Sequence, residues 1–321
     1  MLNKKIDLVY LWCNLDDPNF KQRKENFLKG QIVDKEANNP CRFTDNGELK
    51  YSLRSVELYA PWVNKIYIVT DNQIPDWLNL DNPKIKIVDH KEIMPKSALP
   101  SFNSIAIEHC IKNIPNLEEH FIYANDDTFF NDYTTPEFFF NKKGFPISRF
   151  RKKRKKRYYT IYEYALNNAE NLINNKFHLM LNFEPHHNID AYLKSEVINC
   201  YETFKSEIDK TINSHFRNKE NVERAIYQKY FIAHKKGEFK RVSKIDVKLN
   251  PIKRLINLIK KEYKKDSCLI FPENRNIKET LDKLKPNLYC INDSENTTNE
   301  DRIYIKEFLQ NRYPKKSAFE I

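Results

Sequence analysis

Short strand-like runs alternate with helical stretches through the first 145 residues, and this alternation constrains the fold more than any other feature. Four runs rich in Ile, Val and Tyr are predicted strands, at residues 6–12, 65–70, 84–88 and 120–124. Apolar residues recur at helical spacing in residues 49–59 and 104–114. Strands that alternate with helices predict an α/β fold with a mostly parallel, Rossmann-like sheet.

The rest of the chain is predicted to complete the same unit. Residues 146–240 are predicted to be mostly helical, and residues 241–321 form a C-terminal part with an amphipathic stretch around 255–263. No linker rich in Gly, Ser or Pro separates these parts from residues 1–145. We therefore expect one catalytic domain that spans residues 1–321.

Polar and mostly acidic side chains follow each predicted strand. They are Asn14, Asp16 and Asp17; Asp71 and Asn72; Asp89 and His90; and Asn125, Asp126 and Asp127. Ligands of open α/β sheets bind beyond the carboxyl ends of the strands, so these side chains are candidates for one crevice. The alternative interpretation is that each cluster only forms a turn or caps the following helix.

Glycine is scarce, with four residues in the whole chain. A dinucleotide fingerprint needs three glycines within about six residues, and a P-loop needs two glycines that flank about four residues before a Lys. Both phosphate-binding loops are excluded. A phosphorylated ligand would have to be held by metal ions and charged side chains, and the net charge of +11 favours an anionic ligand.

Two adjacent carboxylates, Asp126 and Asp127, end the fourth predicted strand and are bounded by aromatic residues. Mg²⁺ and Mn²⁺ bind to carboxylates and complete their coordination shell with phosphate and water. Such a pair would hold a nucleoside diphosphate without glycines, although Asp-Asp is also frequent in turns. A later apolar run ends in Asp293, which is a further candidate ligand.

The segment 42–55 places Asp45 and Asn46 directly before a predicted helix. Either side chain would serve as the helix N-cap, which is a purely structural role. Helix N-termini also favour anions, and Arg54 on this helix is a candidate clamp for a phosphate group.

Histidine and arginine in the second part of the chain are candidates for proton transfer and phosphate binding. His186 and His187 are adjacent, and Arg217 follows 30 residues after His187. Histidine is the usual general base for a hydroxyl acceptor, and arginine is suited to a charged phosphoryl group. The alternative for either histidine is a structural role.

Four regions together resemble the stealth family of sugar-1-phosphate transferases, which includes bacterial capsular polysaccharide phosphotransferases and the Golgi enzyme that tags lysosomal glycoproteins. The regions are residues 6–18; 42–78 with 99–108 and 114–130; 184–194 with 211–222; and 290–296 with 311–320. The resemblance implies a glycosyltransferase-A-like fold. It also implies transfer of a sugar 1-phosphate from a UDP-sugar to a glycan hydroxyl, with formation of a phosphodiester and release of UMP.

The resemblance implies a role for each group of candidates. Asp126 and Asp127, with Asp293, would bind Mg²⁺ or Mn²⁺ and neutralise the diphosphate, so Asp127 also counts as catalytic. Arg217 would stabilise charge on the transferred group, and Asp45 would orient the substrate or the metal. The expected substrate-binding residues are Asn46, Arg54, Asp16, Asp71, Asn103 and Asn125.

The histidine region departs from the family pattern. Members show His, any residue, Pro, whereas here Pro185 precedes both histidines. The spacing from Arg217 favours His187 as the catalytic base that takes the proton, and proximity to Pro185 favours His186. We predict that the base is His187 and keep His186 as the second candidate.

Two other functions fit parts of the sequence. A metal-dependent glycosyltransferase would use the same Asp pair but release UDP. A binder of nucleic acid or another polyanion is supported only by the net charge and by residues 149–157, where eight of nine residues are basic. That run is either a solvated segment or a contact for anionic lipid or a lipid-linked glycan acceptor. We expect no specific nucleic-acid partner.

Several features bear on the compartment. The longest stretch without a charged residue, 97–107, has 11 residues and is too short to span a bilayer. Asp7 interrupts the only apolar run near the N-terminus, which argues against a signal peptide. The six scattered cysteines include no C-x-x-C pair and are predicted to be reduced, mostly packed thiols rather than disulfides or a zinc site. We expect a cytoplasmic protein, with or without peripheral contact at the inner face of the plasma membrane.

Overall fold

The computed structural model describes residues 4–153, 159–179, 183–242 and 266–321. Its main sheet has the strand order β3-β2-β1-β4-β8. The strands are β1 (Ile6–Leu11), β2 (Ile66–Thr70), β3 (Ile85–Asp89), β4 (His120–Asn125) and β8 (Asp190–Leu193). β1 to β4 are parallel, and β8 is antiparallel to β4 at the edge. The predicted mostly parallel, Rossmann-like α/β sheet is confirmed.

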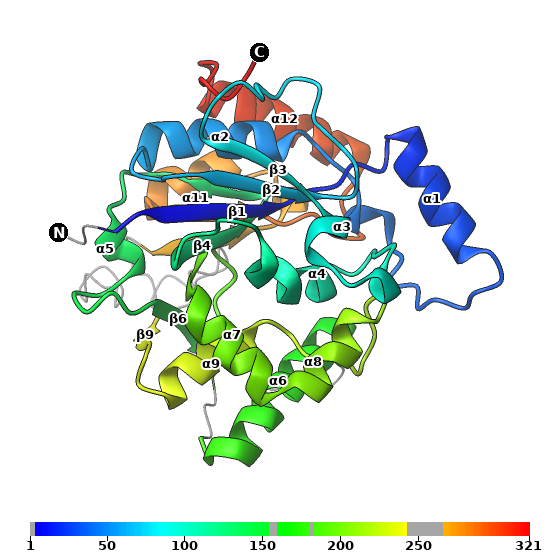
Figure 1. Ribbon diagram of the computed structural model, residues 1–321. Helices are drawn as coiled ribbons and strands as arrows, with labels where there is room; N and C mark the ends of the chain where they lie inside the picture. The colour runs from blue at the N-terminus through cyan, green and yellow to red at the C-terminus, as the bar shows by residue number, and fades with distance from the viewer. Residues whose placement is uncertain (1–3, 154–158, 180–182, 243–265) are drawn as a thin grey trace.

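Helices cover both faces of the main sheet (Figure 1). Alternate side chains of β1 point to opposite faces, because Leu8 belongs to the core under α2 (Glu48–Tyr59) and Val9 to the core on the other side. The helices of that other side are α4 (Ser104–Cys110), α6 (Ile161–Phe177), α7 (Lys194–Thr203), α8 (Lys205–Ile212) and α9 (Ala225–Ala233). Burial on both faces explains why the strands are almost continuously apolar.

The second part of the chain contains the helices α6 to α9 and also short strands. A three-stranded sheet joins β7 (Phe183–Pro185), β6 (Ile147–Lys152) and β9 (Glu238–Arg241). β8 lies in the same part of the chain and extends the main sheet. The second part is therefore attached to the first by strand pairing as well as by helix packing.

The basic run begins in strand β6. Arg149 is buried and forms an ion pair with Asp266, and Arg151 forms an ion pair with Glu184 at 2.7 Å. These partners engage both guanidinium groups, so the expectation that the run is solvated or contacts anionic lipid is wrong for Arg149 and Arg151, whereas Lys152 is exposed. Its last residues, 154–157, and the predicted amphipathic stretch 255–263 lie outside the described residues.

The C-terminal part packs directly against the end of β4. β10 (Ser267–Ile270), β11 (Leu288–Ile291) and β5 (Thr128–Phe130) form a third sheet, in which β11 is antiparallel to β5. The backbone N–H of Ile291 donates to the carbonyl oxygen of Asp127 at 3.0 Å. α12 (Asn299–Arg312) contacts α2 on the outer side of the molecule (Figure 1). The remaining helices are α1 (Pro18–Leu28), α3 (His90–Ile93), α5 (Pro136–Phe139) and α11 (Ile277–Leu284).

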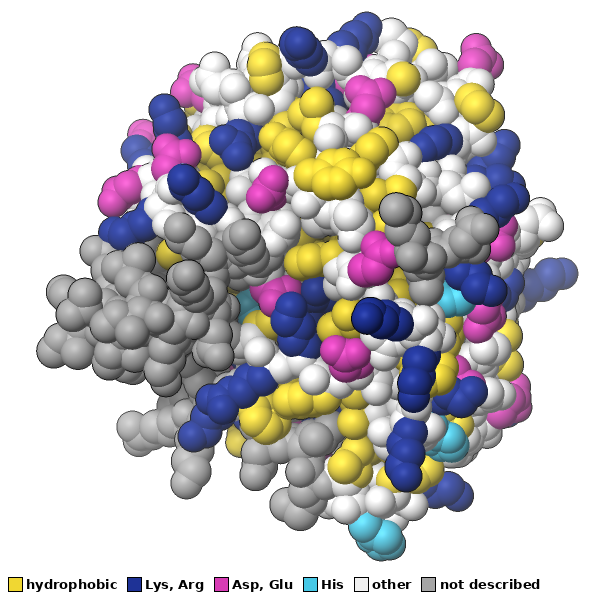
Figure 2. Space-filling view, turned by 90° about the vertical axis from the view of Figure 1, so that its left-hand side faces the viewer, with side chains coloured by type: hydrophobic (Ala, Val, Ile, Leu, Met, Phe, Trp, Pro, Cys, Tyr) yellow, Lys and Arg dark blue, Asp and Glu magenta, His cyan; other side chains and the backbone are white. Residues whose placement is uncertain are grey.

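Figure 2 shows the face at the amino ends of the main strands. Lys and Arg side chains are spread over it with Asp and Glu side chains between them, and apolar side chains gather in its upper half. A shallow hollow at this end of the sheet is lined by Lys4, Lys5 and Lys84 beside Trp62. Within the described ranges no helix has the length and apolar character needed to cross a membrane. All six cysteines are free thiols, as predicted.

Candidate active site

The turn between β4 and β5 places Asp126 and Asp127 at the carboxyl end of the main sheet. Both residues are half-buried. Burial raises the pKa of Asp127 to about 6, and burial together with the charge of Asp127 raises the pKa of Asp126. Crowded, partly desolvated carboxyl groups are stabilised in their charged form by a nearby cation, so this turn is suited to bind one.

A second acidic segment lies at the start of α2. Gly47, at a φ of 83°, is the N-cap residue, and its N–H donates to Asp45 Oδ1 at 2.8 Å. The Asn46 side chain donates to Glu48 Oε1 at 2.7 Å. The expectation that Asp45 or Asn46 caps the helix is therefore wrong. Glycine takes that position because its left-handed φ turns the chain into the helix without a clash of a Cβ atom.

Glu48 belongs to this acidic group and was missed by the sequence analysis. It is buried, and burial together with nearby Asp45 raises its pKa to about 8. The charge of Glu48 also contributes to the raised pKa of Asp126. No local signal distinguished Glu48, because an acidic residue in the first turn of a helix is already explained by the helix dipole.

The two adjacent histidines have different neighbours. His186 is buried, and its Nδ1 lies in hydrogen-bond contact with Ser267 Oγ at 2.8 Å. His187 Nε2 is buried without a hydrogen-bond partner among the described residues. Burial, with positive charge from Arg224, lowers the pKa of His187 to about 3, so the ring is neutral. An anionic ligand would offset that positive charge and make the ring a better proton acceptor.

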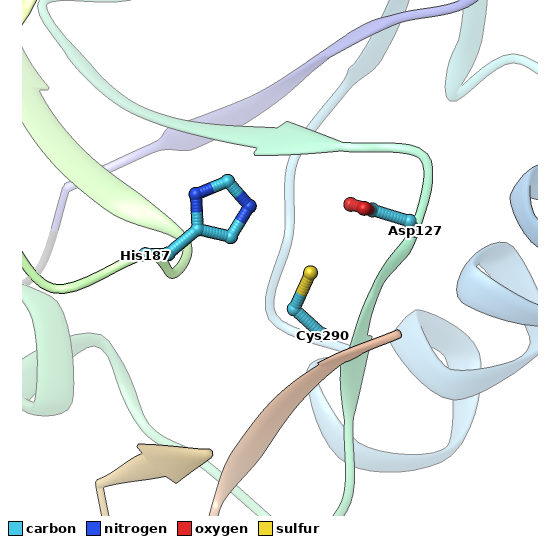
Figure 3. A group of neighbouring side chains, drawn as sticks. All are labelled: Asp127, His187 and Cys290. Carbon is cyan, nitrogen blue, oxygen red and sulfur yellow. The ribbon is translucent and has the colours of Figure 1, made fainter. Parts of the chain in front are cut away.

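Asp127, His187 and Cys290 bring together three distant segments of the chain. One potential ligand atom of each lies within 4.8 Å of the others, and Figure 3 shows the three side chains pointing toward one another. Cys290 pairs with Thr128 in the antiparallel register of β11 and β5, which sets it beside Asp127. The sequence analysis interpreted Cys290 as a packed thiol, because its position beside Asp127 depends on this pairing.

Arg217 supplies positive charge that acts on both His187 and Arg42. Arg217 donates from Nη2 to the hydroxyl of Ser104, the first residue of α4. Burial and the charge of Arg217 together lower the pKa of Arg42 to about 10, and the charge of Arg217 also contributes to the low pKa of His187. A guanidinium whose charge is destabilised by burial and by a second guanidinium favours an anion beside it.

Arg224 is a further residue that the sequence analysis missed. Its guanidinium lies over the ring of Tyr123 on β4, 4.8 Å from the centroid, and pairs with Asp190 on β8 at 3.1 Å. After burial, its charge is the largest influence on the pKa of His187. Arg224 therefore links two strands of the main sheet and sets the local charge at the predicted base.

Arg54 contacts the C-terminal end of the chain. Its Nε and Nη2 donate to the two carboxylate oxygens of Glu320 at 2.8 and 2.7 Å, and Nη1 donates to the carbonyl oxygen of Tyr313 at 2.6 Å. Both partners of the ion pair are largely buried, with side chains 11% and 2% exposed. The expectation that Arg54 clamps a phosphate is wrong, because this guanidinium fastens residues 313–320 to α2.

Asn103 holds the segment that contains Arg217. Its side-chain oxygen accepts from the N–H of Ile105 as the N-cap of α4, and its amide donates to Ser214 O and Asn221 Oδ1, each at 2.9 Å. These contacts use the acceptor and both donor hydrogens of a fully buried side chain. The expectation that Asn103 binds the substrate is wrong, and Asn103 instead positions the residues on either side of Arg217.

Two predicted acidic residues have cationic partners. Asp293 pairs with Arg302 at 3.1 Å, and its charge helps to raise the pKa of Asp127. Asp71, just after β2, pairs with Arg23 at 3.1 Å. Asp293 is thus close to the acidic turn, but its carboxylate is already held by a guanidinium.

The other polar residues after the strands divide between the crevice and the helix caps. Asn125 accepts from the hydroxyl of Tyr123 at 2.8 Å, and Asp16 is exposed. Asp17 caps α1 and Asp89 caps α3 through side-chain hydrogen bonds. The structural interpretation of these clusters therefore holds for Asp17 and Asp89.

Comparison with known proteins gives a consistent result. Residues 42–147 match the family described as Stealth protein CR2, conserved region 2. A capsular polysaccharide phosphotransferase of Haemophilus influenzae, fcs1, is 34% identical over 94% of this chain and 81% of its own length. Another from Streptococcus pneumoniae, WcwK, is 28% identical over 99% of this chain and 98% of its own length.

Other matches span a smaller share of the relative's length or have a lower sequence identity. An exopolysaccharide phosphotransferase of Lactiplantibacillus plantarum, cps2G, is 49% identical over 44% of this chain, and the match spans 41% of that relative's length. The solved structure of the galactosyltransferase LgtC aligns over 98% of this chain and 97% of its own, at a TM-score of 0.42 and 8% identity. On the two relatives matched along nearly the whole chain, this protein belongs to the stealth family of polysaccharide phosphotransferases.

Proposed function

We propose that this enzyme transfers a sugar 1-phosphate from a UDP-sugar to a hydroxyl group of a glycan, and that it releases UMP during synthesis of a capsule or another surface polysaccharide. The names of the relatives support phosphotransfer in polysaccharide synthesis, and the UDP-sugar donor rests on the family resemblance. The observation that carries the chemistry is the buried Nε2 of His187, which has no hydrogen-bond partner among the described residues and faces Asp127 (Figure 3).

The donor set of the acidic cluster fits Mg²⁺ or Mn²⁺. Asp45, Glu48, Asp126 and Asp127 are carboxyl groups whose pKa values are raised chiefly by burial, and a divalent cation would stabilise their charged forms. Asp126 and Asp127 would hold the ion. When bound, the ion supplies positive charge that offsets the charge of the diphosphate.

The chain's own residues would bind the donor and move one proton. Arg217 would bind the phosphate that is transferred, since a guanidinium matches phosphate geometry and keeps its charge. His187 Nε2 would accept the proton of the acceptor hydroxyl as its oxygen attacks the phosphorus nearer the sugar. An oxygen–phosphorus bond forms, the bond from that phosphorus to the bridging oxygen breaks, and UMP leaves with the bridging oxygen.

The test is incubation of the full chain with a panel of UDP-sugars, Mg²⁺ or Mn²⁺, and glycan acceptors in free and lipid-linked form. We expect UMP and a new phosphodiester signal in the phosphorus NMR spectrum of the glycan. UDP release with no phosphorus in the glycan would overturn the proposal and identify a metal-dependent glycosyltransferase.

A matched pair of variants checks the role of Arg217. Arg217→Lys keeps the charge but loses the planar fork, so we expect turnover to fall about 100-fold, as when one preorganised donor to a transition state is removed. Arg241→Lys makes the same exchange at an exposed position of β9 and should retain full turnover. Equal turnover in the two variants would contradict the assignment.

A further inference from the structure

We propose that Asp127, His187 and Cys290 form a binding site for a thiophilic divalent cation of the zinc class, and that occupation of this site stops the enzyme. The binding part of the inference stands on the geometry alone. The inhibitory part rests on the proposed function, in which His187 accepts a proton.

The ligand chemistry separates this site from the acidic cluster. A thiolate, an imidazole nitrogen and a carboxylate are the donors that zinc prefers, and three protein ligands with an open fourth position are typical of an accessible zinc site. Mg²⁺ prefers oxygen ligands alone and gains nothing from sulfur. Cys290 therefore gives this group an affinity for zinc-like ions that the carboxylates of Asp45, Glu48 and Asp126 do not provide.

The positions of the three side chains suit one ion. Their potential ligand atoms lie within 4.8 Å of one another, and a tetrahedral zinc ion spaces its ligand atoms about 3.3–3.8 Å apart. An inward movement of about 1 Å, within reach of side-chain rotation, would close the difference. The backbone holds two of the ligands in place, because Ile291 N–H donates to Asp127 O at 3.0 Å and Cys290 pairs with Thr128.

The state of His187 is the second observation. Its Nε2 is buried and has no hydrogen-bond partner in the described part of the chain, although a buried polar atom normally has one. In Figure 3 the ring faces Asp127 and Cys290. A free nitrogen that points at a carboxylate and a thiol is a preformed ligand for a cation.

Occupation of this site and turnover exclude each other. A nitrogen lone pair that binds zinc cannot accept the proton of the acceptor hydroxyl, and Asp127 cannot then complete the Mg²⁺ or Mn²⁺ site with Asp126. Zinc-class ions bind N, O and S ligands more tightly than Mg²⁺ or Mn²⁺ do. We therefore expect low concentrations of Zn²⁺ to inhibit the enzyme in the presence of excess Mg²⁺.

The test uses Co²⁺ as a spectroscopic probe of the full, metal-free chain, followed by displacement with Zn²⁺. We expect a thiolate-to-cobalt absorption band in the unsubstituted protein and in Cys268→Ser, and no such band in Cys290→Ser. Cys268 and Cys290 lie on neighbouring strands and are each 1% exposed. Each Cys→Ser substitution therefore places a hydroxyl group in an equally buried position, and we expect the same loss of stability in both variants. The affinity of Cys290→Ser for Co²⁺ should fall about 100-fold.

A second variant covers the case in which Cys290→Ser does not fold. His187→Ala, in the loop between β7 and β8, should keep Cys290 but weaken cobalt binding by a similar factor. Absence of the thiolate band in the folded, unsubstituted protein would overturn the proposed site, as would full affinity in both variants.

The two proposals fail differently. A cobalt–thiolate band without UMP release from any UDP-sugar would leave the metal site standing and overturn the proposed function. UMP release that is insensitive to Zn²⁺, with no cobalt–thiolate band, would overturn the metal site and leave the proposed function standing.

Discussion

The acidic and basic sides of the candidate site are built in different ways. On the acidic side, Asp45, Glu48, Asp126 and Asp127 come from two short segments of the first 145 residues, and burial raises the pKa of each. On the basic side, Arg42 pairs with Glu36 and Arg224 pairs with Asp190, each at 3.1 Å, whereas Arg217 donates to the hydroxyl of Ser104.

The difference shows which side depends on a ligand. Desolvated carboxyl groups crowded against one another keep the charged state at a cost in free energy, and a bound cation removes that cost. The charges of Arg42 and Arg224 are already balanced by carboxylates, and the guanidinium of Arg217 is held in place by a hydroxyl group and can accept an anionic ligand. We infer that the acidic side is completed by a cation, whereas the basic side is preorganised for the phosphate.

The largest effect is expected from removal of one charge on the acidic side. Asp127→Asn keeps the shape of the side chain but loses a metal ligand, so turnover should fall about 1,000-fold, the equivalent of several kcal/mol of charge stabilisation. The measurement is the rate of UMP release at saturating Mg²⁺. Asp132→Asn, at an exposed position a few residues further on, is the control and should retain turnover. A loss of less than tenfold in Asp127→Asn would break the proposed division of roles.

Variants of His186 and His187 test which of the two histidines is the general base. His187→Ala should lower turnover about 100-fold or more, since it removes the general base. His186→Ala should retain turnover and lose about 1 kcal/mol of the free energy of unfolding, because the buried contact with Ser267 is lost. Turnover and urea denaturation of both variants give the comparison. The opposite pattern would make His186 the base.

A variant of Arg54 on α2 tests whether this arginine binds phosphate or only stabilises the fold. Arg54→Met leaves the buried carboxylate of Glu320 without its partner and should cost about 3 kcal/mol of stability, with turnover of the folded protein unchanged. Arg275→Met removes the ion pairs of an exposed guanidinium with Glu300 and Asp301 and should cost less stability than Arg54→Met. A selective loss of turnover in Arg54→Met would restore the predicted phosphate clamp.

The pH dependence of the metal-free protein sharpens the account of the acidic side. The folded-state pKa values of Asp127 and Glu48, about 6 and about 8, lie above their ordinary values, so the folded state binds protons more tightly than the unfolded state. The contribution of these two carboxyl groups to stability should therefore fall as the pH rises from about 4 to about 8, whereas His187, whose pKa is lowered to about 3, contributes in the opposite direction. Mg²⁺ should raise the melting temperature more at pH 8 than at pH 5, and the stability of Glu48→Gln relative to the unsubstituted protein should increase as the pH rises. A stability difference between these two proteins that does not change with pH would contradict the assignment.

The smallest effect is expected from a matched pair of glycines. Gly47 and Gly30 both have a left-handed φ and space around the Cβ position, so Val at either site should cost about 1–2 kcal/mol of stability. Only Gly47→Val should also lower turnover, because the N–H of Gly47 orients Asp45. Equal turnover in the two variants would show that this turn is not part of the site.

The sequence by itself determined the main elements and one half of the site. The predicted strands match β1 to β4 closely, because strand and helix periodicity is written in neighbouring residues. The acidic turn at Asp126 and Asp127 was found in the same way, since parallel strands bring their carboxyl ends to one edge. The short strands β6 and β7 were not visible in the sequence.

Only the tertiary structure decided which side chains meet. Arg54 was predicted to bind phosphate, yet its partner Glu320 is 266 residues away. Cys290 lies beside Asp127 because β11 pairs with β5, and His187 rather than His186 faces that pair because of the loop before β8. The periodicity of a sequence indicates the local backbone geometry. Contacts between distant residues depend instead on how remote strands pair and on which buried polar side chains are left without a hydrogen-bond partner.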